Sequence, residues 1–124
     1  MPKGLRPITT YHLFVSETIN KNTAESSVAI DLREVAQDGI FSIEYYITGS
    51  GTLKIEYNLC SIKGGTYIEP TSGADIASGL TSSSGTSGRD IVTFNPELAP
   101  FLKIKVTETG TAADAVIDLK LNIQ

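Results

Sequence analysis

The feature that most constrains the fold is a strict alternation of apolar and polar residues between positions 40 and 60. A period of two places alternate side chains on one face of a β-strand. The segment 49–51, Gly-Ser-Gly, divides the alternation into two halves. The apolar positions are Phe41, Ile43, Tyr45 and Ile47 in the first half, and Leu53, Ile55, Tyr57 and Leu59 in the second.

This pattern predicts a β-hairpin closed by the three-residue loop 49–51. A two-residue loop would oppose apolar to polar residues along the whole pair, which a buried face does not allow. On the outer face, the predicted register places Glu44 opposite Glu56 and Tyr46 opposite Lys54. We therefore expect one polar hairpin face that carries all four side chains.

Further β-strands are predicted wherever apolar residues alternate between turn residues. A chain with about eight amphipathic strands and no long helix pattern is expected to form two antiparallel sheets packed face to face. We predict an all-β sandwich, a jelly roll or a related Greek-key fold, as a single domain over residues 8–124. Besides the hairpin, the predicted strands are 8–16, 26–32, 67–68, 91–94, 102–106 and 117–123, with a long Ser/Thr/Gly-rich surface loop over 70–90.

Residues 1–7 are expected to lie outside this domain as an extended arm. Pro2, Gly4 and Pro7 disfavour both a helix and a central strand. Lys3 and Arg6 give the arm positive charge on an otherwise acidic chain. We predict that the arm docks on a partner surface.

Charge and hydropathy exclude several classes of function. The net charge is -4, and the basic residues are scattered, which argues against a nucleic-acid partner. No apolar run approaches the roughly 18 residues of a membrane span, and the first residues do not resemble a signal peptide. We therefore expect synthesis in a host cytoplasm. The single cysteine, Cys60, excludes an internal disulfide bond and is predicted to be a surface or interface thiol rather than a nucleophile.

The sequence contains no recognisable catalytic or metal-binding motif. His12 is the only histidine, and no G-x-S-x-G, nucleotide-binding, EF-hand or zinc-ligand spacing occurs. The opposed Glu44 and Glu56 are an alternative acid-base or cation-binding pair, but the absence of Trp disfavours a glycosidase. We predict no enzymatic activity, no cofactor and no metal site. The candidate partner-contact residues are Lys3, Arg6, Tyr46 and Lys54.

Two segments resemble small virion proteins of tailed bacteriophages. They are NPELAPFLKIKVTETGTAADAVI, which begins at Asn95, and YYITGSGTLKIE, which begins at Tyr45. The resemblance covers residues 40–124 and implies a non-enzymatic virion component of the head-decoration, capsid-cement, neck or tail type. It also implies protein contacts with a capsid or tail lattice and a symmetric homo-oligomer.

A second hypothesis is a carbohydrate-binding or host-recognition β-sandwich. The outward Tyr46 and the Ser/Thr/Gly-rich loop motivate it, because exposed aromatic rings contact sugars as well as proteins. A glycan array separates the two hypotheses.

Overall fold

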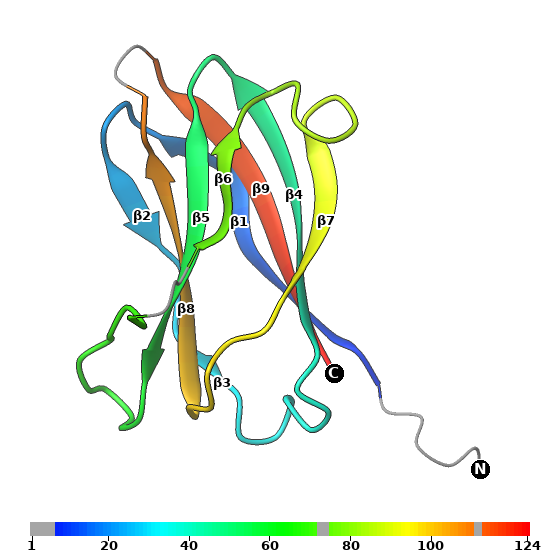
Figure 1. Ribbon diagram of the computed structural model, residues 1–124, viewed down its shortest axis with the longest axis vertical. Coiled ribbons are helices and arrows are strands. Elements are labelled where there is room, and N and C mark those ends of the chain that lie inside the picture. The colour runs from blue at the N-terminus through cyan, green and yellow to red at the C-terminus, as the bar shows by residue number, and fades with distance from the viewer. Residues whose placement is uncertain (1–6, 72–74, 111–112) are drawn as a thin grey trace.

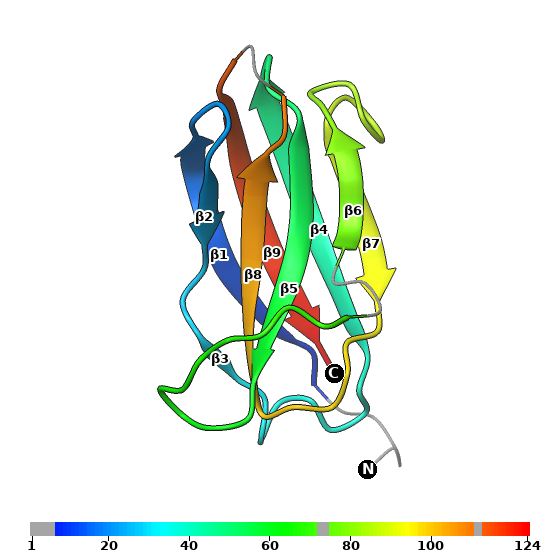
Figure 2. The ribbon, with the colours of Figure 1, turned by 60° about the vertical axis from the view of Figure 1, so that its left-hand side comes forward.

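The computed structural model describes residues 7–71, 75–110 and 113–124. Within these residues the chain forms nine β-strands and no helix, and the strands form two antiparallel sheets (Figure 1). Figure 2 shows the sheets as two facing layers. The strands are β1 (Thr9–Ile19), β2 (Ala24–Ser26), β3 (Ile30–Asp31), β4 (Phe41–Gly49), β5 (Leu53–Cys60), β6 (Asp75–Leu80), β7 (Arg89–Phe94), β8 (Phe101–Glu108) and β9 (Ala115–Ile123).

The strand order defines a jelly roll. One sheet has the order β1-β9-β4-β7, and the other has the order β2-β8-β5-β6, with β3 also paired to β8. Early strands pair with late ones, β1 with β9, β2 with β8, β4 with β7 and β5 with β6, as in a long hairpin rolled over on itself. The predicted all-β sandwich is confirmed. No helix in the described ranges is long and apolar enough to cross a membrane.

The core lies between the two sheets and is built from the alternating inward residues. In β4, β5, β8 and β9 the inward apolar side chains are buried, and each contributes about 1.5–3 kcal/mol relative to exposure. The apolar positions predicted from residues 40–60 all belong to this core. Fully enclosed members include Ile43, Ile47, Leu53, Ile55, Leu102, Ile104, Ile117, Leu119, Leu121 and Ile123.

The predicted hairpin over residues 40–60 is wrong. Strand β4 pairs with β7 and β9, whereas β5 pairs with β6 and β8 in the opposite sheet. The connection 50–52 is therefore an arch from one sheet to the other. The alternation of apolar and polar residues requires only that the apolar face of each strand is turned toward the core. An arch between two sheets satisfies this requirement as well as a hairpin within one sheet does.

Glycine allows this arch to lie against the loop before β9. The Gly51 N–H donates to the carbonyl of Asp114 at 3.0 Å. A Cβ at Gly51 would lie only 2.8 Å from the carbonyl oxygen of Ala113. Gly49 has a φ of 91°, in the left-handed region that glycine adopts readily.

Strand β1 is longer than predicted and its faces differ from the prediction. Register shifts occur between His12 and Phe14 and between Phe14 and Glu17, as β-bulges produce. As a result Phe14 is buried and Val15 is 70% exposed, although the alternation predicted for 8–16 places Val15 on the same face as Tyr11 and Leu13. The predicted strand 26–32 is also interrupted, because β2 ends at Ser26 and β3 begins at Ile30.

The segment 70–90 is not one long loop. It contains β6, which pairs with β5 at the edge of its sheet, and the start of β7. The predicted brief strand at 67–68 corresponds to a bridge between Ile68 and Leu59. Edge pairing uses backbone groups, so a Ser- and Gly-rich sequence can form it without an alternating pattern.

A buried carboxylate joins three segments at the upper end of the sandwich. The Glu108 side chain accepts the backbone N–H of Asn22 at 2.8 Å, of Thr52 at 2.8 Å and of Gly110 at 2.9 Å. These bonds hold its pKa below the ordinary value, against the opposing effect of burial. Glu108 thus ties the β1–β2 loop and the β4–β5 arch to the end of β8.

Candidate functional site

The candidate partner-contact residues are not gathered on one surface. Lys3 and Arg6 lie outside the described residues. Tyr46 lies on β4 and Lys54 on β5, so the two side chains belong to the outer faces of opposite sheets. The single polar face expected from a hairpin does not exist, and contact roles for the four residues stay predictions.

A hollow of about 310 Å³ lies on the β1-β9-β4-β7 sheet, and we call it the sheet-face hollow. Its charged groups pair within the sheet. The Arg89 guanidinium lies 4.1 Å from the centre of the Tyr46 ring, and Lys120 Nζ lies 3.6 Å from Glu44 Oε2. Residues that line it include His12, Glu44, Tyr46, Arg89, Asp118 and Lys120.

These contacts limit what the sheet-face hollow can do. A sugar ring could stack on Tyr46 only after displacement of Arg89 from that ring face. His12 is exposed at the hollow, and the described lining residues include no serine or cysteine that it could activate. The hollow is therefore a polar surface without the parts of a nucleophile-base pair.

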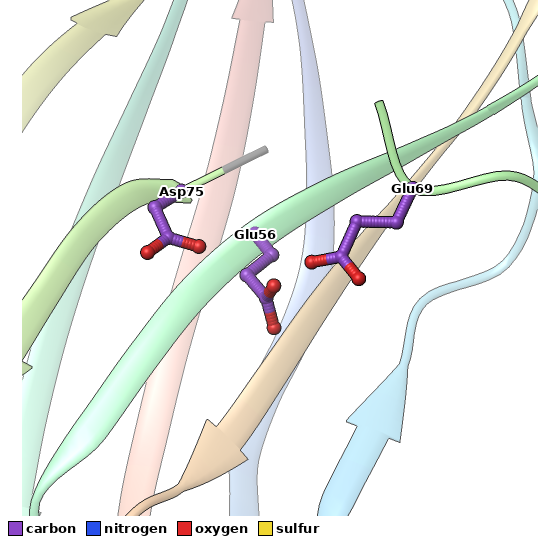
Figure 3. A group of neighbouring side chains, drawn as sticks. All are labelled: Glu56, Glu69 and Asp75. Carbon is purple, nitrogen blue, oxygen red and sulfur yellow. The ribbon is translucent and has the colours of Figure 1, made fainter. Parts of the chain in front are cut away.

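Three carboxylates meet on the opposite sheet: Glu56 on β5, Glu69 in the segment that follows it, and Asp75 at the start of β6. Figure 3 shows Glu56 between the other two side chains. One oxygen from each residue lies within 4.8 Å of the others. We call this group the carboxylate cluster. Sequence reasoning paired Glu56 with Glu44, which lies in the other sheet, and it missed Glu69 and Asp75 because no local pattern joins them.

Burial and mutual contact shift the pKa values of two residues in the cluster. Glu56 is only 3% exposed, and burial together with its hydrogen bond to Glu69 raises its pKa. The same hydrogen bond lowers the pKa of Glu69, which is exposed. Two close carboxyl groups separate in pKa in this way, so Glu56 loses its proton at a higher pH than Glu69 does.

A lysine supplies the positive charge within this cluster. Lys54 Nζ lies 3.6 Å from Glu56 Oε2 and 3.9 Å from Asp75 Oδ1. Three carboxylates suit a hard divalent cation in ligand type, but here a single ammonium group already lies beside two of them. The arrangement connects β5 to the start of β6 and does not require a metal ion.

A second hollow, the basal groove, lies at the lower end of the sandwich and has a volume of about 470 Å³. Most of its lining is apolar. Tyr57 donates its hydroxyl to Glu97 Oε1 at 2.7 Å, and burial with this carboxylate raises the pKa of Tyr57 to about 12. The groove is lined by Leu32, Arg33, Ala36, Gly39, Phe41 and residues 95–100.

The prediction of a surface thiol at Cys60 is wrong. Cys60 is buried, and its Sγ donates to the carbonyl of Ile62 at 3.0 Å. A Cβ at Gly65 would lie 3.0 Å from the same sulfur, so the turn that follows β5 covers the thiol. The outward position in the strand pattern did not reveal this covering turn.

Comparison with known proteins identifies the fold class and no family. No protein-family model and no curated protein matches the sequence. Similar solved structures are particles of infectious bursal disease virus. The T=1 particles derived from that virus give a TM-score of 0.54 at 12% identity, covering 95% of this chain and 32% of that chain.

Two further structures agree with this match. The VP2 subviral particle of the same virus gives a TM-score of 0.51 at 14% identity, over 95% of this chain and 32% of that one. The structure of the Gt strain of the virus gives a TM-score of 0.51 at 12% identity, over 95% of this chain and 33% of that chain. The chain thus spans about one third of these proteins, and at such identities the likeness shows the fold alone.

Proposed function

We propose that this chain is a non-enzymatic structural protein of a virion that binds a capsid or tail lattice through protein contacts. The observation that carries the proposal is the jelly-roll strand order, which is similar over 95% of the chain to subunits of virus particles. The resemblance of the segments at Tyr45 and Asn95 to small virion proteins supports a tailed bacteriophage as the source.

The surface chemistry supports binding rather than catalysis. In the described residues, each sheet face carries an ion pair, Lys120 with Glu44 on one face and Lys54 with Glu56 on the other. Large apolar side chains are exposed at the lower end, including Ile40 and Leu98. Exposed apolar groups beside a hollow are typical of protein contact surfaces.

We further propose that the protein acts as a homo-oligomer and that Lys3, Arg6, Tyr46 and Lys54 contribute to partner contacts. Cyclic symmetry repeats one patch around an axis and is the common arrangement for small homo-oligomers. Sedimentation velocity of the purified protein at micromolar concentration measures the subunit number. A strictly monomeric protein would contradict self-association in isolation.

The decisive experiment for the virion role combines composition and reconstitution. Mass spectrometry of gradient-purified virions of the encoding virus should detect this chain at a fixed ratio to the major capsid protein. Particles that lack it should bind the purified protein in a cosedimentation assay. Absence of the chain from purified virions, together with no binding to depleted particles, would overturn the proposal.

A glycan-binding module is a second proposed function, favoured by the sheet-face hollow with Tyr46 in its lining. A glycan array with the wild-type protein and with Tyr46→Ala tests it. Reproducible binding that Tyr46→Ala abolishes would favour this function. The stacking of Arg89 on Tyr46 leads us to expect no such binding.

A further inference from the structure

Strand β7 is the least protected sheet edge among the residues that the structure describes. Natural sheets protect their edges with bulges, with very short strands or with charged residues. Strands β1 and β6 are interrupted by register shifts, and β2 and β3 have only three and two residues. Strand β7 pairs with β4 through six consecutive residues without a shift, and no described strand lies on its other side (Figure 1). Strand β7 is therefore the edge best suited to accept a further strand.

The backbone groups of β7 face the free edge at odd-numbered positions. The carbonyl of Gly88 accepts the N–H of Ile47 on β4 at 2.9 Å, so even-numbered positions face β4. In agreement, the N–H of Ile91 does not bond to β4 and instead donates to Asp90 Oδ1 at 2.8 Å. By the same alternation, the backbone groups of residues 93 and 95 also point away from the sheet.

Only part of this edge is open. Arg89 donates its N–H to the carbonyl of Thr86 at 3.1 Å and accepts the N–H of Thr86 at 2.8 Å, so the preceding turn covers the edge there. At the other end Pro96 has no N–H and does not extend a ladder. We call residues 91–95 the open edge. None of these five residues is charged.

The apolar interior of the sandwich reaches the surface beside the open edge. Strands β6 and β7 contact each other at the same side of the two sheets (Figure 2). Val92 on β7 and Ile76 and Ala77 on β6 pack against the core but stay half-buried. Ile91, on the outer face, is 61% exposed. A partner that continues both layers would remove this apolar surface from water.

We propose that the open edge pairs with the open edge of a second copy, antiparallel and about a two-fold axis at Thr93. The β1-β9-β4-β7 sheet then continues from one copy into the other. This register places Val92 opposite Phe94 of the second copy, so that apolar inner residues meet, and Thr93 opposite its own counterpart. The open edge is thus complementary to itself. The inference rests on the self-association proposed above and names its interface.

Other two-fold registers fit less well. An axis at Ile91 would need the edge of Arg89, which the preceding turn covers. An axis at Val92 would set the carboxylate of Asp90 opposite Phe94 on the inner face, where it would lose water. An axis at Phe94 would shorten the ladder to 93–95 and leave Ile91 uncovered. Only the axis at residue 93 uses the whole open edge.

Disulfide formation in the full-length protein, with Cys60→Ala, tests this register. Two residues that exchange backbone hydrogen bonds across an antiparallel pair have Cα atoms about 5.5 Å apart, which a disulfide bridges. Thr93→Cys should therefore form covalent dimers under mild oxidation. Ser26→Cys, at an exposed position of edge strand β2, is the matched control and should stay monomeric on a non-reducing gel.

Two further cysteines make the test stricter. The proposed register sets Ile91 opposite Asn95 of the second copy, and it separates each from its own counterpart by about 13 Å along the strands. A mixture of Ile91→Cys and Asn95→Cys proteins should therefore cross-link, whereas neither variant should cross-link alone. Failure of Thr93→Cys to cross-link, or cross-linking of Ile91→Cys alone, would overturn the proposed interface.

Sedimentation velocity at micromolar concentration measures the same contact without a covalent bond. Thr93→Lys places two ammonium groups opposite each other at the axis and should weaken dimerisation at least about tenfold. Ser26→Lys on β2 is the matched control and should leave it unchanged. Circular dichroism verifies that each variant is folded.

The outcomes separate the interface from the functions proposed above. Self-association that Thr93→Lys leaves unchanged would overturn pairing through β7 but not the oligomer. A strictly monomeric wild-type protein would overturn both. The virion role is judged independently, from the presence of the chain in purified virions.

Discussion

Replacement of Glu108 by glutamine tests the interpretation of the upper end of the sandwich most directly. The two carboxylate oxygens together accept three backbone N–H groups, from Asn22, Thr52 and Gly110. Glutamine has nearly the same shape, but only one of its two terminal atoms accepts hydrogen bonds. If its oxygen takes the position of Oε2, the amide nitrogen faces the N–H of Asn22, and two donors meet without an acceptor.

The expected cost follows from the number and charge of these bonds. Hydrogen bonds to charged groups contribute about 1.5–3 kcal/mol each, compared with about 0.5–1.5 kcal/mol for neutral ones. One bond is lost, two become neutral, and Glu108 is only 1% exposed, so water cannot replace the lost acceptor. We expect Glu108→Gln to lower the free energy of unfolding by about 2–4 kcal/mol. At roughly 4 °C per kcal/mol, the thermal midpoint should fall by about 8–16 °C.

Urea unfolding at pH 7, followed by circular dichroism, measures this difference. The slope with urea should stay unchanged if the native and unfolded states keep their compactness. Glu25→Gln on β2 is the matched control, because Glu25 is exposed, and it should change stability by less than about 0.5 kcal/mol.

The difference should also depend on pH. The pKa of Glu108 is lowered in the folded protein, so its stabilising effect is present above the ordinary pKa of 4.5 and is lost as pH falls through the folded-state value. Glutamine does not titrate, and the gap between the two proteins should therefore narrow in acid. An equal gap at pH 7 and at about pH 3, or no gap at pH 7, would refute the reasoning.

Three further predictions concern the arch, the carboxylate cluster and the thiol. Gly51→Ala should lower the free energy of unfolding by about 1–3 kcal/mol in urea, because its Cβ meets the carbonyl of Ala113, whereas Ser50→Ala at an exposed position should not. Because the pKa of Glu56 is raised in the folded state, wild-type stability should fall as pH rises through that folded-state pKa. In Glu56→Gln this fall should disappear, and an identical profile of thermal midpoint against pH would contradict the raised pKa of Glu56. Cys60 should react with a chromogenic disulfide reagent roughly a hundredfold faster in urea than in the native protein, and rapid native reaction would show that the thiol is accessible.

The alternation in the sequence predicted strands and inward faces well, since both depend on neighbours along the chain. Phe41, Ile43 and Tyr45 are buried as expected, and so are Ile117 and Leu119 near the C-terminus. The pattern failed where local irregularities intervene. Bulges in β1 change which of its side chains face the core. Strand β6 pairs through its backbone, and its sequence has little alternation of apolar and polar residues from which to predict it.

The sequence by itself determined an all-β chain and the side of each regular strand that faces the core. Only the tertiary structure decided which strands are neighbours, because backbone hydrogen bonds are chemically the same for almost every residue. That choice turned a predicted hairpin into an arch between sheets. It separated Glu44 from Glu56 and brought Glu69 and Asp75 beside Glu56. The candidate sites depend on contacts between distant segments, which a period of two along the chain does not encode.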